Sequence, residues 1–185
     1  MATLSVGGTT VFDGATLQSG AVFPTGHVLQ VKCTPVTDRS SSVDTDTSGT
    51  GTDCGLNVTI TPVSSTSDFL IMLGIGVWGS AAANSIGMIL SKDGVKIGNG
   101  IDSSSRNGVW IRGVKFVSDD NHSWGISAHY LDTASGSGQR VYKCGMISQT
   151  SSAAYINMSG NNSDTALVYG SYTSSSLTVM EIQGV

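Results

Sequence analysis

The sequence predicts an all-β protein, a jelly-roll-like antiparallel β-sandwich with an extended N-terminal arm. Three observations support this prediction. Glu occurs once and Lys five times among 185 residues, so the residues that usually cover helix surfaces are nearly missing. Short segments in which apolar and polar residues alternate recur along the chain, and turn residues separate them. No segment shows a helical period, and about nine such strands favour two packed sheets.

Residues 1–26 are expected to form an N-terminal attachment arm, and residues 27–185 a single β-sandwich domain. The arm contains short β-prone pieces between glycines, with too few apolar residues to build a core. Such pieces can add backbone hydrogen bonds to an exposed strand of a partner, and aromatic anchors strengthen such interfaces. The expected anchors are Leu4, Val6, Val11, Phe12 and Phe23. The alternative is that the arm packs on its own sandwich or on a sister subunit.

The sandwich is predicted to begin with a half-buried strand that starts at Val28. Odd positions of this strand are apolar and even positions are polar, which is typical of a strand with one buried face. We expect the apolar face, which contains Leu29, Val31 and Cys33, to point into the core. After it, residues 38–53 are rich in Ser, Thr, Asp and Gly and are predicted to form a polar loop.

The strands that follow alternate with turn signals. Apolar and polar residues alternate over residues 56–60, whereas Phe69–Trp78 is apolar on both faces, which predicts a central strand covered on each side. Gly74 and Gly76 argue against a helix there and indicate a bend or bulge. The remaining strands are expected at Ser85–Ser91, Val95–Ile97, Val109–Phe116, Trp124–Leu131, Val141–Ser148, Ala153–Met158 and Leu177–Ile182. Val109 and Ile111 share one face of their strand, whereas Val114 and Phe116 share the other, so we expect a β-bulge at Gly113.

Composition argues against two classes of partner. Nine Lys and Arg residues against thirteen acidic residues, a net charge of −4, provide no basic surface for nucleic acid. The longest apolar stretch is about ten residues, half of what a membrane-spanning helix needs. We therefore expect neither a nucleic-acid nor a membrane partner.

The three cysteines, Cys33, Cys54 and Cys144, lack the paired spacing of a zinc site. We expect all three to be reduced residues of the core. A disulfide between Cys33 and Cys54 is the alternative.

One loop shows part of a metal-binding pattern. Asp44 and Asp46 begin a run with oxygen ligands at alternate positions, as at the start of a calcium loop. The acidic residue that should stand at position twelve is replaced by Gly55. A solvated loop, in which Asp and Ser side chains bond to their own backbone, is the favoured interpretation.

Histidines and aromatic residues identify no catalytic site. His27, His122 and His129 show neither a metal-ligand spacing nor a nucleophile motif. A single Glu excludes a Glu–Glu glycosidase pair and leaves an Asp–Asp pair as the alternative. The three tryptophans and five tyrosines could stack on sugars, but most lie in apolar strands, where they are expected to fill the core. We therefore expect no enzyme activity, no cofactor and no metal.

Four segments share their order and spacing with a known family. They are residues 23–31 (FPTGHVLQV), 55–62 (GLNVTITP), 130–132 (YLD) with the Ser/Gly turn that leads to Tyr142, and 176–182 (SLTVMEI). In this order they resemble small β-structured virion proteins and fibre domains of tailed bacteriophages, common among phages of aquatic bacteria. The resemblance covers most of residues 23–183. The loop at 45–54 is longer than the family's usual pattern, and Cys54 interrupts the expected Asp-Gly-Leu junction.

The resemblance implies a non-enzymatic structural protein on the exterior of a phage particle, assembled as a homotrimer. Its other implied partner is the major capsid protein or another virion protein. The chain contains neither heptads nor a repetitive shaft, the usual stalks of a long fibre, so we favour a capsid cement or decoration protein. The alternative is a short tail fibre or knob that binds a host receptor such as a surface glycan.

Overall fold

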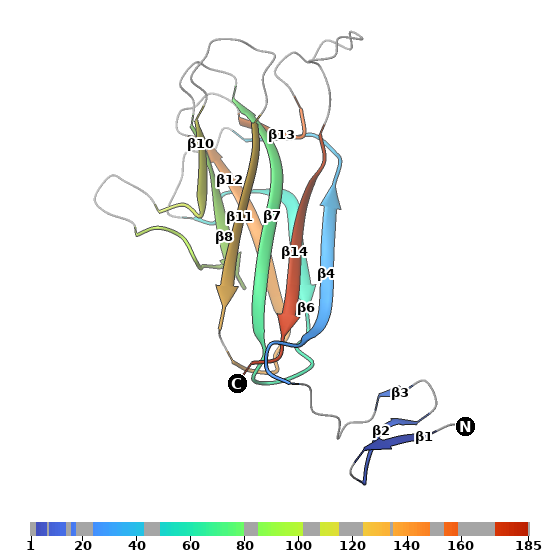
Figure 1. Ribbon diagram of the computed structural model, residues 1–185. Helices are drawn as coiled ribbons and strands as arrows, with labels where there is room; N and C mark the ends of the chain where they lie inside the picture. Colours follow the sequence, from blue (N-terminus) through green and yellow to red (C-terminus); the bar gives the residue numbers. More distant parts are fainter. Residues whose placement is uncertain are drawn as a thin grey trace.

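The computed structural model is an all-β sandwich, as the sequence predicts (Figure 1). It describes residues 3–6, 8–13, 16–17, 24–42, 49–79, 85–101, 108–114, 124–133, 135–148, 154–158 and 173–184. Within these residues every regular element is a strand. The strands are β1 (Thr3–Val6), β2 (Thr9–Asp13), β3 (Thr16–Leu17), β4 (Val28–Val36), β5 (Ser40–Ser42), β6 (Thr52–Ile60), β7 (Asp68–Gly79), β8 (Ser85–Lys92), β9 (Val95–Lys96), β10 (Ile111–Val114), β11 (Trp124–Asp132), β12 (Arg140–Ser148), β13 (Ala154–Ile156) and β14 (Ser175–Ile182). The described part of the chain holds no helix of the length and hydrophobicity that a membrane crossing requires.

Several strands are interrupted and continue in line. Val77 of β7 pairs with Trp124 of β11 on one side and with Ile156 of β13 on the other, so β13 lies on the side of β7 away from β11. Strand β14 pairs with β7 on this same side. Strand β5 likewise continues β4 along this position, and β9 continues β10 beside β8. Counted this way, each of the two sheets of the sandwich has four strand positions.

The order of these positions is that of a jelly roll. Numbered along the chain, they are β4/β5, β6, β7, β8, β9/β10, β11, β12 and β13/β14. The front sheet in Figure 1 has the order β11, β7, β13/β14, β4/β5, and the rear sheet β9/β10, β8, β12, β6. The front sheet thus contains positions six, three, eight and one, and these face positions five, four, seven and two of the rear sheet, in that order. All paired neighbours within each sheet are antiparallel, which makes two interlocked Greek keys.

The core lies between the two sheets and follows the predicted alternation on β6. Strand β7, which the sequence predicts to be covered on both faces, buries one face and leaves Leu70 and Met72 of the other half-buried. On β6 and β7 every second residue is buried, and the two inner faces meet in one apolar layer. Its largest fully buried side chains include Tyr142, Phe69, Leu56 and Met146. The half-buried Trp110 and Tyr130 pack against this layer from the side of β10 and β11.

The prediction for the first sandwich strand is wrong about which face is buried. Val31 of β4 is 53% exposed and Cys33 is also exposed. The polar residues at even positions face inward, where Gln30 donates a hydrogen bond to Glu181 and the Thr34 hydroxyl donates one to the Asn57 carbonyl. At this edge of the sandwich the inward face meets backbone groups of β6 and a buried carboxylate, so polar side chains suit it.

Three smaller predictions are also corrected. Strand β10 pairs with β8 without a register shift, so Gly113 marks no bulge; the strand begins at Ile111 and leaves Val109 outside it. Strand β7 pairs with β11 in continuous register through Gly74 and Gly76, so the bend or bulge predicted at these glycines is not found in this pairing. Gly76 instead allows a close approach, since a Cβ there would lie 2.3 Å from the hydroxyl oxygen of Thr173. Strand β5 falls within the segment predicted to be a loop.

Asn157 closes the break between β13 and β14. This residue is fully buried and has a left-handed backbone, with φ of 61°. Its amide nitrogen donates to the carbonyls of Val36 at 2.8 Å and Asp38 at 3.1 Å, which satisfies the matching break between β4 and β5. Its amide oxygen accepts a hydrogen bond from Ser175. One side chain therefore satisfies backbone groups at two strand interruptions.

Glu181, the only glutamate of the chain, is fully buried on β14. One carboxylate oxygen accepts hydrogen bonds from the backbone N–H groups of Val63 and Ser64 and from the Ser67 hydroxyl. The other oxygen accepts the bond from Gln30. The carboxylate thus fixes the turn between β6 and β7 and the edge strand β4 to the centre of the front sheet.

We expect Asn157→Ala to lower the free energy of unfolding by about 3 kcal/mol, because it leaves buried polar groups unpaired and puts alanine in the left-handed region. Urea unfolding followed by circular dichroism measures this loss. Asn57→Ala is the matched control. The amide of Asn57 makes one hydrogen bond, a long one of 3.4 Å to the Gly55 carbonyl, so its loss should cost under about 0.5 kcal/mol. Equal losses in the two variants would contradict this role of Asn157.

Candidate functional site: the N-terminal sheet

Strands β1, β2 and β3 form a separate three-stranded antiparallel sheet in the order β1–β2–β3. The register places Leu4 opposite Phe12, and Phe12 opposite Leu17, so one apolar row crosses all three strands. Val6 lies two residues from Leu4 and belongs to the same face. Val11 falls at the irregularity where the register of β1 and β2 shifts.

The opposite face of this sheet is polar. Ser5 pairs with Thr10, Thr3 with Asp13, and Asp13 with Thr16. A sheet with one apolar and one polar face needs a second layer against its apolar side. In Figure 1 the sheet lies apart from the sandwich, and none of the other strands that the structure describes pairs with it.

The arm leaves the sandwich beside the C-terminal strand. The Gly26 N–H donates to the carbonyl of Gln183 at 2.8 Å, and the Gln183 N–H donates to the carbonyl of His27 at 2.8 Å. These bonds anchor the chain just before β4 begins. Of the five predicted anchors, the structure brings Leu4, Val6 and Phe12 onto one face of the N-terminal sheet and sets Val11 at its irregularity. The fifth, Phe23, lies outside the described residues.

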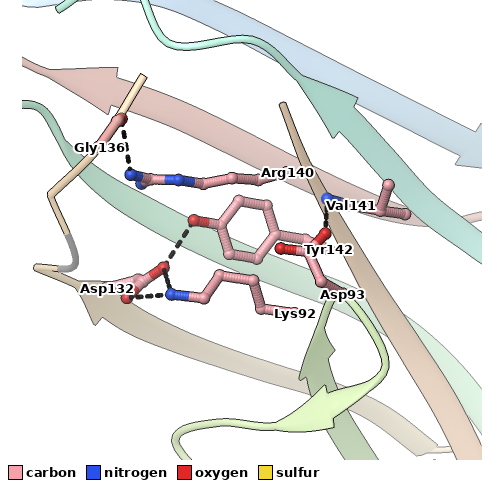
Figure 2. A network of polar contacts seen from close by, with 7 residues as sticks. All are labelled: Lys92, Asp93, Asp132, Gly136, Arg140, Val141 and Tyr142. Carbon is pink, nitrogen blue, oxygen red and sulfur yellow. Dashed lines mark hydrogen bonds and ion pairs between the residues drawn. The ribbon is translucent and has the colours of Figure 1, made fainter. Parts of the chain in front are cut away.

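A polar network joins the two sheets at the base of the sandwich (Figure 2). Asp132, at the end of β11 in the front sheet, accepts a bond of 2.9 Å from Lys92 of β8 and one of 2.7 Å from the Tyr142 hydroxyl of β12. Burial, together with the Asp132 carboxylate, raises the pKa of Tyr142. The phenol therefore stays protonated at neutral pH, so the network serves as a cross-link between the sheets rather than as a source of a nucleophile.

Arg140 lies in the same network and is 6% exposed. Its guanidinium stacks over the Phe69 ring, 4.4 Å from the centroid, and donates to the carbonyl of Gly136 at 3.0 Å. Its Nη1 is the one buried side-chain nitrogen without a hydrogen-bond partner among the described residues. The cation–π contact offsets part of the cost of burying this charge.

The sequence did not single out Asp132, Arg140 or Glu181 as structural residues. A signal was present for two of them, because Asp132 continues the inward positions of β11 and Glu181 those of β14. An acidic residue at an inward position of a strand is rarely buried unless hydrogen-bond donors or a cation pair with its carboxylate. Those partners come from strands distant in the chain.

The cysteines divide into two buried thiols and one exposed thiol. Cys54 and Cys144 are buried, whereas the expectation that Cys33 is a core residue is wrong. All three are free, so no Cys33–Cys54 disulfide forms. The Cys54 thiol donates to the carbonyl of Cys144 at 3.0 Å, and burial raises the pKa of Cys54 to about 11. Burial also raises the pKa of Cys144, so both are thiols rather than thiolates at neutral pH.

Other candidate residues do not converge. His27 stands at the base of the arm and His129 on β11, and among the described residues no group of three metal-ligand side chains is found. Trp110 packs against the core, and its indole N–H donates to the carbonyl of His129. His122 and the Asp44–Asp46 run lie outside the described residues.

No protein-family model matches the chain, and no curated protein aligns with it significantly.

We expect Asp132→Asn to lower the free energy of unfolding by about 3 kcal/mol, because it leaves the Lys92 charge without its buried partner. Thermal and urea unfolding measure the change. Asp53→Asn is the control, since Asp53 forms an exposed ion pair with Lys143 at 3.5 Å that should contribute under about 0.5 kcal/mol. Equal stability of the two variants would show that the buried pair does not cross-link the sheets.

Stability is expected to fall as pH rises from about 9 to about 11. In this window the unfolded chain releases the Cys54 proton, at its ordinary pKa of 9.0, while the folded protein retains it up to about 11. Full loss of this contribution amounts to roughly 2–3 kcal/mol.

Cys54→Ala should therefore reduce the slope of unfolding free energy against pH by up to about 1.4 kcal/mol per unit in this window. Val58→Ala is the matched control, because Val58 is buried on the same face of β6 and carries no titratable group. Parallel pH profiles for wild type and Cys54→Ala would contradict the prediction.

Proposed function

We propose that this chain is a non-enzymatic structural subunit of a bacteriophage particle, a homotrimeric cement protein on the exterior of the head. The sequence resemblance to small virion proteins suggests the particle. The observation that carries the proposal is the N-terminal sheet, which presents an apolar row of Leu4, Phe12 and Leu17 with no second layer in Figure 1. Such a sheet is suited to binding another protein.

The sandwich supports a scaffold role. Jelly rolls form viral capsid proteins as well as lectin domains and other proteins, so this fold is compatible with a particle subunit without identifying one. The buried ionisable groups of the described residues make structural contacts: Asp132 joins the sheets and Glu181 holds a turn. The protonated Cys54, Cys144 and Tyr142 are poor nucleophiles at neutral pH.

The geometry of the arm suggests how it would attach. Strands β1 and β3 are the outer strands of the N-terminal sheet, so each leaves one edge free to add to a strand of the capsid protein. The apolar row would then be buried against the same partner. Six residues, 18–23, connect this sheet to the turn at Pro24 that is bonded to the sandwich, and six residues span up to about 20 Å when extended. The sandwich can therefore stand off the surface to which the arm binds.

The test is binding to capsids that lack the protein. We expect Phe12→Asp to reduce decoration at least about tenfold, because a charge in the apolar row must be desolvated on binding. Thr10→Asp is the control, since Thr10 pairs with Ser5 on the polar face of the same sheet, and it should bind as wild type does. Co-sedimentation with stripped capsids measures both.

Deletion of residues 2–23 removes the arm and keeps the Pro24 carbonyl that accepts the His27 N–H. The truncated protein should fold and fail to decorate. Decoration equal to wild type by the truncated protein would overturn the attachment role. Binding of the wild type to tails or to host glycan, with none to heads, would instead favour the short-fibre alternative.

A further inference from the structure

The outer face of the front sheet carries an apolar row that crosses all four strands. The register aligns Val31 of β4 with Met180 of β14, Met180 with Leu70 of β7, and Leu70 with Leu131 of β11. The two end members lie on the two edges of the sheet and are strongly exposed, Val31 by 53% and Leu131 by 48%. The two middle members are half-buried by their neighbours.

The two rows on one side of it are free of formal charge. One contains Cys33, Thr178, Met72 and His129, and the next contains Ser176, Gly74 and Ser127. On the other side of the apolar row, Val28, which is 42% exposed, pairs with Ile182, and Ile182 pairs with Asp68 at the end of the face. The face is therefore apolar or small over most of its length.

Strand β7 shows that the described residues put no second layer over this face. Its inner residues are buried, and its outer residues Leu70 and Met72 are equally apolar, which is typical of a strand with a layer on each side. In Figure 1 nothing is drawn over β11, β7, β14 and β4 on their outer side. The described part of the chain therefore covers the inner side of β7 and leaves its outer side without a second layer.

We propose that the outer face of this sheet lines the three-fold axis of the homotrimer, so that the missing layer is the same face of two further copies. Four strands at about 4.8 Å spacing give a face about 19 Å wide. If three such faces form the sides of a triangular prism, each sheet lies about 5.5 Å from the axis of the prism. This distance is close to the side-chain layer of one sheet, which is half of the ~10 Å that separates two packed sheets. One layer of side chains from each copy fills that space.

The prism also brings the exposed ends of the row together. Around a three-fold axis the β4 edge of one copy meets the β11 edge of the next, so Val31 contacts the Leu131 of its neighbour. The apolar row then continues from copy to copy and closes into a ring. This head-to-tail contact closes only because the copies are related by rotation.

A second copy suits this face better than a charged partner does. The chain has a net charge of −4, so copies associate best through a surface without charged side chains. Interfaces between identical subunits are depleted in charge at their centre and enriched in Met. A face about 19 Å by about 30 Å offers roughly 600 Å² per copy, near the ~800 Å² per partner of standard interfaces.

This inference rests on the trimer of the proposed function and names its surface. The experiment is sedimentation equilibrium of the full chain at micromolar concentration, with wild type, Val31→Asp/Leu131→Asp and Val95→Asp. Val95 is 67% exposed on β9 of the other sheet and makes a matched control. We expect wild type and Val95→Asp to be trimers of the 19.0 kDa chain, and the double variant to be a folded monomer by circular dichroism.

Cys33 gives a second readout that does not depend on sedimentation. It lies on this face and is the exposed one of the three thiols, so a maleimide should label it more slowly in the trimer than in the double variant. A trimeric double variant, equal labelling rates, or a monomeric wild type would each overturn the assignment. Capsid decoration is scored separately through Phe12, so a trimer built on another surface would leave the proposed function standing.

Discussion

The architecture depends on satisfying backbone groups where strands break inside a sheet. An interrupted strand leaves N–H and C=O groups that would cost free energy if they were buried without partners. At the break between β13 and β14, Asn157 bonds to the carbonyls of Val36 and Asp38. At the break between β9 and β10, the side-chain amide of Asn99 bonds to both backbone groups of Leu90. Amide side chains thus replace missing strand partners, and two irregular edges still complete a jelly roll.

The same requirement explains where charge enters the interior. Glu181 accepts hydrogen bonds from a turn and from Gln30, and Asp132 accepts them from Lys92 and Tyr142. Each carboxylate joins elements that the apolar layer alone would hold loosely: a connecting turn in one case and the ends of two sheets in the other. Both acids lie in register with Phe69, so these polar contacts fix one end of the sandwich, while the apolar layer supplies most of its free energy of folding.

Two apolar surfaces remain uncovered by the described part of the chain. The N-terminal sheet has one face containing Leu4 and Phe12, and the sandwich has the outer face of the sheet of β11, β7, β14 and β4. They lie on different elements and have different shapes, a small tethered sheet and a broad fixed one. We propose that the first surface binds a different protein and that the second binds further copies of the chain.

The sequence by itself determined which segments are strands and which residues share a face, because a period of two follows directly from backbone geometry. It therefore predicted nearly every strand of the sandwich and the core of β6 and β7. It also predicted the apolar arm residues, although not that Leu4, Phe12 and Leu17 align across three strands, since register depends on pairing. Alternation does not say which face points inward. For β4 only the tertiary structure decided this, because β6 and the buried carboxylate of Glu181 offer hydrogen-bond partners to Gln30 and Thr34 and leave Val31 outside.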